Sequence, residues 1–320
     1  MEDSINFNMI LGHLGSKCAK GMIRNLVTAC LLFTLSVKAQ DNSLVNADAQ
    51  GQVLKIGIIA DCQYANEPTN GLRHYRLSTR KLTDCVAALN TFGLDHVFHL
   101  GDLIDQHMHS YDSILPIIKR LEAPHTLVLG NHDFSVADSL KQGIPEHLGL
   151  SHRYFSTVVD NWRFIILDGN DVSLYAWPEG SSNTQLATQV FQQQYQHRET
   201  WNGAVGQSQL EWLKKQLDQA EVNAEKVILL CHFPVLPVDS HVLWNHQEVL
   251  ELVTGYTCVK AWFNGHNHAG AYINYYGIHF ITFKGMVDTE ETSYATVTLE
   301  ESQLVIKGFG REKDRVLEIK

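Results

Sequence analysis

Five short apolar runs in this chain each end at a segment that carries aspartate, asparagine, glutamine or histidine. The runs cover residues 53–60, 96–100, 126–129, 226–230 and 259–263. Their length and their content of valine, isoleucine and leucine are typical of buried strands. Functional side chains gather at the carboxyl ends of such strands, because the loops there converge on one edge of the sheet. We therefore expect the five polar segments to meet at a single site.

The rest of the pattern predicts helices between the early strands and antiparallel strands later in the chain. Helices are expected over residues 75–90, 110–121 and 208–220, the last with Ser208 as its N-cap and Glu211 in the capping-box position. Strands followed by helices, and then strands in hairpins, predict a mixed sandwich of two sheets covered by helices.

Two further segments have patterns of their own. Asp160-Asn161 separates two apolar stretches and predicts a β-hairpin over residues 153–167. Residues 169–206 are polar and include a glutamine-rich patch, so we expect an insertion over the site rather than a core element. Residues 271–306 are expected to form strands in hairpins.

Composition limits the possible partners. The chain has 320 residues, of which 44% are hydrophobic, enough for a sizeable core, and its net charge is −10. No basic face is available to neutralise many phosphates, which argues against nucleic acid as a partner. A small phosphate-containing substrate is still compatible with this charge, because bound metal ions can supply positive charge locally.

The N-terminal region is typical of a targeting segment. The apolar run 26–37 is followed by Val37-Lys38-Ala39, a small-residue pattern suited to cleavage before Gln40, and it is too short to span a bilayer permanently. We expect residues 1–39 to be a signal peptide with an upstream extension, and residues 40–52 a linker. Residues 53–320 are expected to form a single catalytic domain of a periplasmic or secreted protein. The alternative is a short N-terminal helix of a cytoplasmic protein.

Four cysteines follow residue 39, at positions without a zinc-binding spacing: Cys62, Cys85, Cys231 and Cys258. We expect them to be buried as small apolar side chains rather than paired in disulfides.

The polar segments match, in order, the motifs of the calcineurin-like metallophosphoesterase family, which this chain resembles. The matching segments are Asp61-Cys62-Gln63, Gly101-Asp102-Leu103-Ile104-Asp105, Gly130-Asn131-His132-Asp133, Cys231-His232 and Gly265-His266-Asn267-His268. Each motif alone is weak evidence, and the ordered set at strand ends carries the resemblance. It implies an α/β (α+β) fold, a four-layer αββα sandwich of two mixed sheets flanked by helices.

Gln63 narrows the resemblance, because most of the family has histidine at this position. With glutamine at this position, the first motif is similar to that of the manganese-dependent ADP-ribose/CDP-alcohol diphosphatase subgroup. Further stretches that are similar to this subgroup include residues 75–78, 163–168, 202–203, 209–213, 285–288 and 306–315. Lys284 and Asp288 depart from it, since we expect more acidic character there.

The resemblance implies a role for each metal-ligating residue. Asp61, Gln63 and His268 would hold a first metal ion, Asn131, His232 and His266 a second, and Asp102 would bridge the two. A bridging carboxylate keeps two divalent ions about 3.5–4 Å apart, and a water between them loses its proton near neutral pH. Oxygen and imidazole ligands suit manganese, iron, cobalt or zinc. The weak amide donor of Gln63 favours manganese.

His132 is expected to be a catalytic residue rather than a ligand. Next to Asn131, it is placed to donate to a phosphate oxygen or to protonate the leaving group, with Asp133 orienting its ring. Asp105 is expected to support a ligand, although both aspartates would serve equally well as helix N-caps. Arg73 and Arg76 would either meet substrate phosphate or lie on a surface helix face.

Together these features predict a hydrolase that cleaves the pyrophosphate bond of nucleoside diphosphate-X compounds such as ADP-ribose and CDP-alcohols. The alternatives are a broad-specificity phosphomonoesterase or phosphodiesterase and, different in kind, a non-catalytic metal-binding protein of the same fold. The expected partner is a small phosphate-containing nucleotide, with no nucleic acid and no stable membrane association, and the protein is expected to be a monomer.

Overall fold

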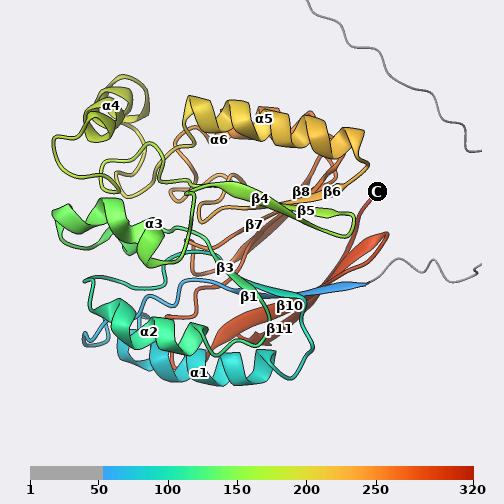
Figure 1. Ribbon diagram of the computed structural model, residues 1–320, viewed down its shortest axis with the longest axis horizontal. Helices are drawn as coiled ribbons and strands as arrows, with labels where there is room; N and C mark the ends of the chain where they lie inside the picture. The colour runs from blue at the N-terminus through green and yellow to red at the C-terminus, as the bar shows by residue number, and fades with distance from the viewer. Residues whose placement is uncertain (1–52) are drawn as a thin grey trace, which may run out of the picture. The chain divides into compact units, whose positions relative to one another are not determined.

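Two six-stranded mixed sheets lie face to face between helices in the computed structural model, which describes residues 53–320 (Figure 1). The predicted sandwich of two mixed sheets flanked by helices is therefore confirmed. The predicted signal peptide (1–39) and the predicted linker (40–52) lie outside the described residues, so both remain predictions.

The first sheet has the strand order β12-β11-β10-β1-β2-β3. Its strands are β1 (Leu54–Ile59), β2 (His96–His99), β3 (His125–Leu127), β10 (Ser293–Leu299), β11 (Gln303–Gly310) and β12 (Arg315–Glu318). β1, β2 and β3 are parallel, whereas β10, β11 and β12 are antiparallel to their neighbours. The carboxyl ends of β1, β2 and β3 therefore lie at one edge of this sheet.

The second sheet has the strand order β4-β5-β6-β7-β9-β8. Its strands are β4 (Phe155–Val159), β5 (Trp162–Ile166), β6 (Lys226–Leu230), β7 (Val259–Asn264), β8 (Ala271–Tyr275) and β9 (Ile278–Thr282). β4 and β5 form the hairpin predicted from Asp160-Asn161. β5, β6, β7 and β9 are parallel, so their carboxyl ends also share one edge.

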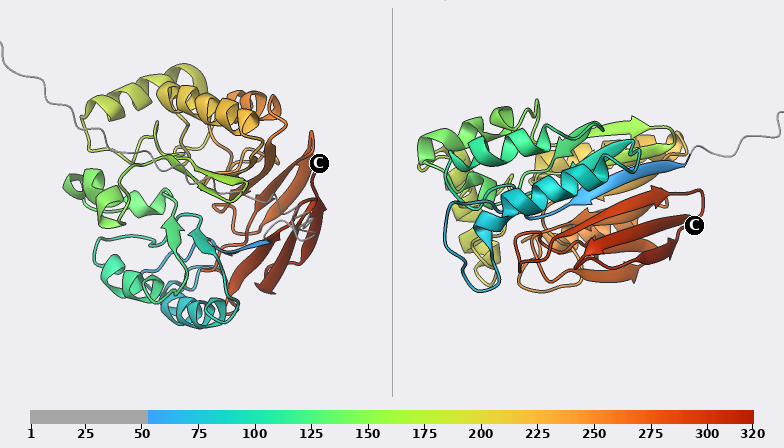
Figure 2. Two further views of the ribbon diagram at one scale, coloured as in Figure 1. Left: turned by 45° about the vertical axis from the view of Figure 1, so that its right-hand side comes forward. Right: turned by 90° about the horizontal axis from the view of Figure 1, so that it is seen from below.

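Alternation along the strands divides the apolar residues between three layers of core. In β6, Ile228 and Leu230 pack between the sheets, while Val227 and Leu229 pack beneath the outer helices. The outer helices of the second sheet are α5 (Gln207–Val222) and α6 (His246–Thr254). α1 (Ser78–Leu89) and α2 (Ser110–Ile118) cover the outer face of the first sheet (Figure 2). Strands buried on both faces explain why the apolar runs in the sequence are continuous.

The predicted N-cap of the helix over residues 208–220 is wrong. α5 begins at Gln207, so Ser208 lies inside the helix and is not its N-cap. The backbone N–H of Gly206, just before the helix, donates to the Asp171 carboxylate instead, over 3.1 Å. An acceptor that lies 35 residues away in sequence thus replaces the local cap.

The segment 169–206 is only in part the polar insertion that the sequence predicts. It contains α4 (Ser182–Val190), and Trp201 in this segment lines the pocket described below. However, Asn202, Ala204 and Val205 are fully or almost fully buried. The end of the segment therefore belongs to the core.

The cysteine prediction is confirmed, since all four cysteines of residues 53–320 are buried and free. Across the same residues, no helix has both the length and the apolar character that a membrane span requires.

Acid is expected to destabilise the fold through buried neutral histidines. Burial lowers the pKa of His99 to about 3 and that of His96 to about 4. The unfolded chain therefore takes up protons that the folded chain excludes, and stability is lost as the pH falls below about 6.5. Replacing His96 with glutamine should make the melting temperature decline less steeply between pH 6.5 and 4.5. Equal slopes in wild type and variant, measured by circular dichroism, would contradict this account.

Candidate metal centre

The predicted ligands lie in loops that follow five parallel strands, three from one sheet and two from the other. β1 leads to Asp61 and Gln63, and β2 leads to Asp102. The loop after β3 contains Asn131, the loop after β6 contains His232, and the loop after β7 contains His266 and His268. The structure thus brings together residues that are scattered over more than two hundred positions.

Asp102, Asn131, His232 and His266 form one tight group. His232 Nε2 lies 3.2 Å from Asp102 Oδ2, 3.1 Å from Asn131 Oδ1 and 3.1 Å from His266 Nδ1. One potential ligand atom from each of Asp102, His232 and His266 falls within 4.8 Å of the others. A single cation could therefore bind these atoms after small side-chain movements.

Asp61, Gln63 and His268 form a second group beside the first. His268 Nε2 lies 3.6 Å from Asp61 Oδ1. Gln63 Nε2 donates to Asp102 Oδ2 over 2.9 Å, which connects the two groups through the Asp102 carboxylate. Gln63 Oε1 and His268 Nε2 are both buried and have no hydrogen-bond partner. Buried polar atoms are otherwise almost always paired, so these two lone pairs fit a cation as their missing partner.

Hydrogen bonds set the tautomer of each histidine of the two groups. His232 Nδ1–H donates to the carbonyl of Leu100 over 2.8 Å, so Nε2 is the nitrogen that faces Asp102, Asn131 and His266. His266 Nε2–H donates to Asn202 Oδ1 over 2.8 Å, which leaves Nδ1 free. His232 Nε2 and His266 Nδ1 face each other over 3.1 Å. A partner on the second ring nitrogen is typical of histidines that bind metals.

His268 is oriented by a carboxylate. Its Nδ1 lies 3.0 Å from Asp288 Oδ1, so Nε2 is the nitrogen near Asp61. The buried ammonium group of Lys81, on α1, donates to main-chain carbonyls of the loop that carries Asp288, including that of Val287 over 3.0 Å. Helix α1 therefore fixes the position of this loop.

The backbone at the site adopts unusual conformations. Asp61, Gln63, Asp102 and His266 all have positive φ angles, of 50°, 41°, 57° and 69°. Residues other than glycine adopt this region at a cost of order 1–2 kcal/mol each, and such strain clusters at functional sites. A side chain at Gly130 would collide with the Asp102 carboxylate, which explains the glycine before Asn131.

The electrostatics couple Asp102 to the imidazoles. Burial alone would raise the pKa of Asp102, but His232 and His132 outweigh this effect and hold it well below the ordinary value. Burial also opposes the charge on His232, yet Asp102 raises the pKa of that imidazole to about 9. Because imidazole binds metal in its neutral form, uptake of a cation here would release a proton.

His132 lies beside the metal-binding groups, and Asp105 orients its ring. His132 Nδ1 donates to the Asp105 carbonyl over 2.9 Å and lies 3.3 Å from its carboxylate. The prediction that Asp133 orients this ring is wrong. Asp133 is fully buried and accepts the backbone N–H groups of Asp102, Leu103 and Gly130, so it holds two site loops together. Neither aspartate caps a helix.

An open pocket of ≈ 550 Å³ lies over these groups. Gln63, Asp102, Asn131 and His266 are among its lining residues, as is His132. The wall is made by Arg73, Ser135, Tyr175, Thr200, Trp201 and His241. The pocket is large enough to hold more than the cations themselves.

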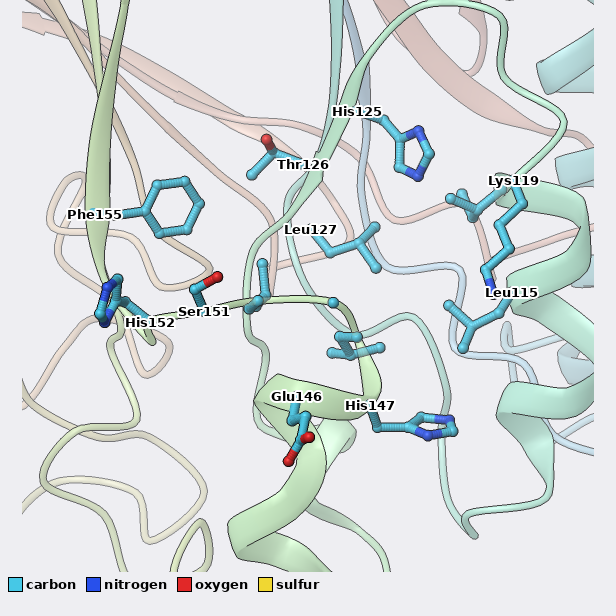
Figure 3. A pocket seen from close by; sticks show the side chains of 14 residues that line it. Leu115, Lys119, His125, Thr126, Leu127, Glu146, His147, Ser151, His152 and Phe155 are labelled. Atoms are coloured by element: carbon cyan, nitrogen blue, oxygen red, sulfur yellow. The ribbon is translucent and has the colours of Figure 1, made fainter.

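A second pocket, of ≈ 620 Å³, lies away from the predicted ligands, between α2, β3, α3 (Ile144–His147) and the start of β4 (Figure 3). Its side chains include Lys119, His125, Glu146 and His147, and it shares no residue with the pocket over the site. The larger of these two pockets therefore contains none of the predicted metal ligands.

Two supporting residues, Asn202 and Asp288, were missed by the sequence reasoning. Residues 202–203 and 285–288 do belong to the stretches that carry the family resemblance, but nothing local to them indicates which histidine they contact. Asn202 lies 64 residues from His266.

Comparison with known proteins agrees with this geometry. Residues 54–270 match the family model for calcineurin-like phosphoesterases. The manganese-dependent ADP-ribose/CDP-alcohol diphosphatase of Xenopus tropicalis is 27% identical, over 82% of this chain and 93% of its own length. The human protein of the same name is 25% identical, over 86% and 95%. A crystal structure of a dimetal phosphatase from Danio rerio superposes with a TM-score of 0.74 at 26% identity, covering 83% of this chain and 99% of that protein.

Replacing Asn202 with alanine is expected to weaken metal binding, because His266 Nε2 loses its acceptor and the ring is free to turn. Loss of such a partner typically costs about 10–100-fold in affinity. Metal content would be measured by mass spectrometry after dialysis against graded free manganese. Asn274→Ala is the matched control, since Asn274 also contacts a histidine ring, that of His279, on β8 and β9. Equal metal affinity in both variants would refute a positioning role for Asn202.

Proposed function

The chain belongs to the calcineurin-like phosphoesterase family, and from this premise we propose that it hydrolyses the pyrophosphate bond of nucleoside diphosphate-X compounds such as ADP-ribose and CDP-alcohols. The relatives that carry this activity in their names match the chain over 82–86% of its length and 93–95% of their own. Gln63 and the six stretches between residues 75 and 315 that are named in the sequence analysis are similar to the same subgroup.

The observation that carries the proposal is the pair of adjacent ligand groups that share Asp102. We propose that Asp61, Gln63 and His268 hold one divalent cation, that Asn131, His232 and His266 hold another, and that Asp102 bridges them. The orphaned Gln63 Oε1 and His268 Nε2 support this assignment. Two bound cations would neutralise phosphate oxygens and supply a hydroxide nucleophile near neutral pH.

The donor set favours manganese. It offers carboxylate and amide oxygens and imidazole nitrogens and no thiolate, which suits manganese and also iron, cobalt or zinc. All four cysteines of the described part of the chain are buried, and burial raises the pKa of the Cys62 thiol, next to Asp61, well above its ordinary value, so it offers no thiolate to a metal ion.

His132 is the proposed general acid. Its Nδ1 is engaged by Asp105, so Nε2 is the nitrogen available to a substrate in the pocket. When the bond between the bridging oxygen and the attacked phosphorus breaks, the electron pair stays on that oxygen, and His132 donates a proton to it or stabilises it by a hydrogen bond. Water supplies the hydroxyl group to the other product.

A substrate comparison tests the proposal. Purified protein with manganese would be offered ADP-ribose, CDP-choline and p-nitrophenyl phosphate, and we expect kcat/KM to be highest for the first two. Preference for p-nitrophenyl phosphate would support a phosphomonoesterase instead. Inactivity on all three, with two manganese ions bound, would support a non-catalytic binding protein.

Replacing His132 with alanine is expected to lower kcat by about 10²–10⁴-fold, the usual contribution of a general acid. Metal content should stay near that of the wild type, because His132 is not a proposed ligand. His109→Ala serves as the control, since His109 is exposed and does not line the pocket. Loss of metal from the His132 variant would mean that His132 is a ligand.

A further inference from the structure

Arg73 places a positive charge in the pocket over the site. It is the one lysine or arginine among the described residues that line this pocket. Its side chain is 39% exposed, and its closest ionic contact is a loose one, 3.9 Å from Nη1 to Asp105 Oδ1. By contrast, Arg153 and Arg163 each contact a carboxylate at 2.6 Å. The guanidinium of Arg73 therefore keeps donors available for a ligand.

The backbone holds Arg73 firmly beside the site. Its N–H donates to the carbonyl of Asn70 over 3.0 Å and its carbonyl accepts from the same residue, also over 3.0 Å. Arg73 forms a β-bridge with Asp288, the residue that orients His268. These contacts hold the backbone of Arg73 in place, and its side chain extends from there to line the pocket.

Asp105 places Arg73 on the same side of the pocket as His132. The Asp105 carboxylate lies 3.3 Å from His132 Nδ1 and 3.9 Å from Arg73 Nη1. The general acid acts on the leaving group, so Arg73 also lies on the leaving-group side. In a pyrophosphate, that leaving group is itself a phosphate, which gains negative charge as the bond breaks.

We propose that Arg73 binds the leaving phosphate, next to the phosphate that is attacked, and thereby selects substrates with two linked phosphates over monoesters. This inference rests on the proposed function. An arginine suits the role because its planar guanidinium can donate two parallel hydrogen bonds to a phosphate. The bound cations are expected to neutralise the attacked phosphate, whereas Arg73 donates hydrogen bonds to the leaving phosphate.

The kinetic test compares two substrates in two variants. Arg73→Gln should lower kcat/KM for ADP-ribose by about 10–100-fold, mainly through a higher KM, as expected for loss of a charge-assisted hydrogen bond. The same variant should change kcat/KM for p-nitrophenyl phosphate less than about threefold. For ADP-ribose, kcat/KM of Arg73→Lys should fall between that of the wild type and that of Arg73→Gln. Arg76→Gln is the matched control, because Arg76 bonds to Asn66 and does not line the pocket. An equal loss on both substrates, or no loss on either, would overturn the proposal.

A binding measurement separates this proposal from the proposed function. Manganese-loaded wild type is expected to bind α,β-methylene-ADP, which cannot be cleaved between its phosphates, more tightly than AMP. Arg73→Gln should remove most of that preference while keeping its manganese content. Because this assay needs no turnover, it tests Arg73 even if wild type proves inactive on ADP-ribose. A preference that survives in the variant, or a variant that loses its metal, would refute the selective role of Arg73.

Discussion

The buried carboxylate of Asp102 is the group on which the rest of the site depends. It exposes none of its surface, so it needs partners, and it finds them on three other loops: Gln63 Nε2, the backbone N–H of His132 and His232 Nε2. An unpaired charge at this depth would cost several kcal/mol. The loops of both sheets therefore meet at this carboxylate.

The strands, the arrangement of the two sheets and the positions of the predicted ligands could be inferred from the sequence, because the signals are local. Each apolar run ends no more than three residues before a predicted ligand, and parallel strands bring such ends together whatever the connections between them.

The supporting contacts could not be inferred, because they join segments that are distant in sequence. Asp133 is adjacent to His132 but points into the loop after β2, whereas Asp105, 27 residues earlier, reaches the His132 ring. Asn202 and Asp288 reach their histidines only when the segment 169–206 and the loop after β9 are folded. The start of α5 shows the same limit, since Asp171 receives the N–H group just before that helix.

The shared role of Asp102 is tested most directly by anomalous diffraction from crystals grown with manganese. Two anomalous peaks are expected, about 3.5–4 Å apart, with the Asp102 carboxylate between them, one near Asp61 and His268 and the other near His232 and His266. A single peak, or two peaks that do not share Asp102, would contradict the account.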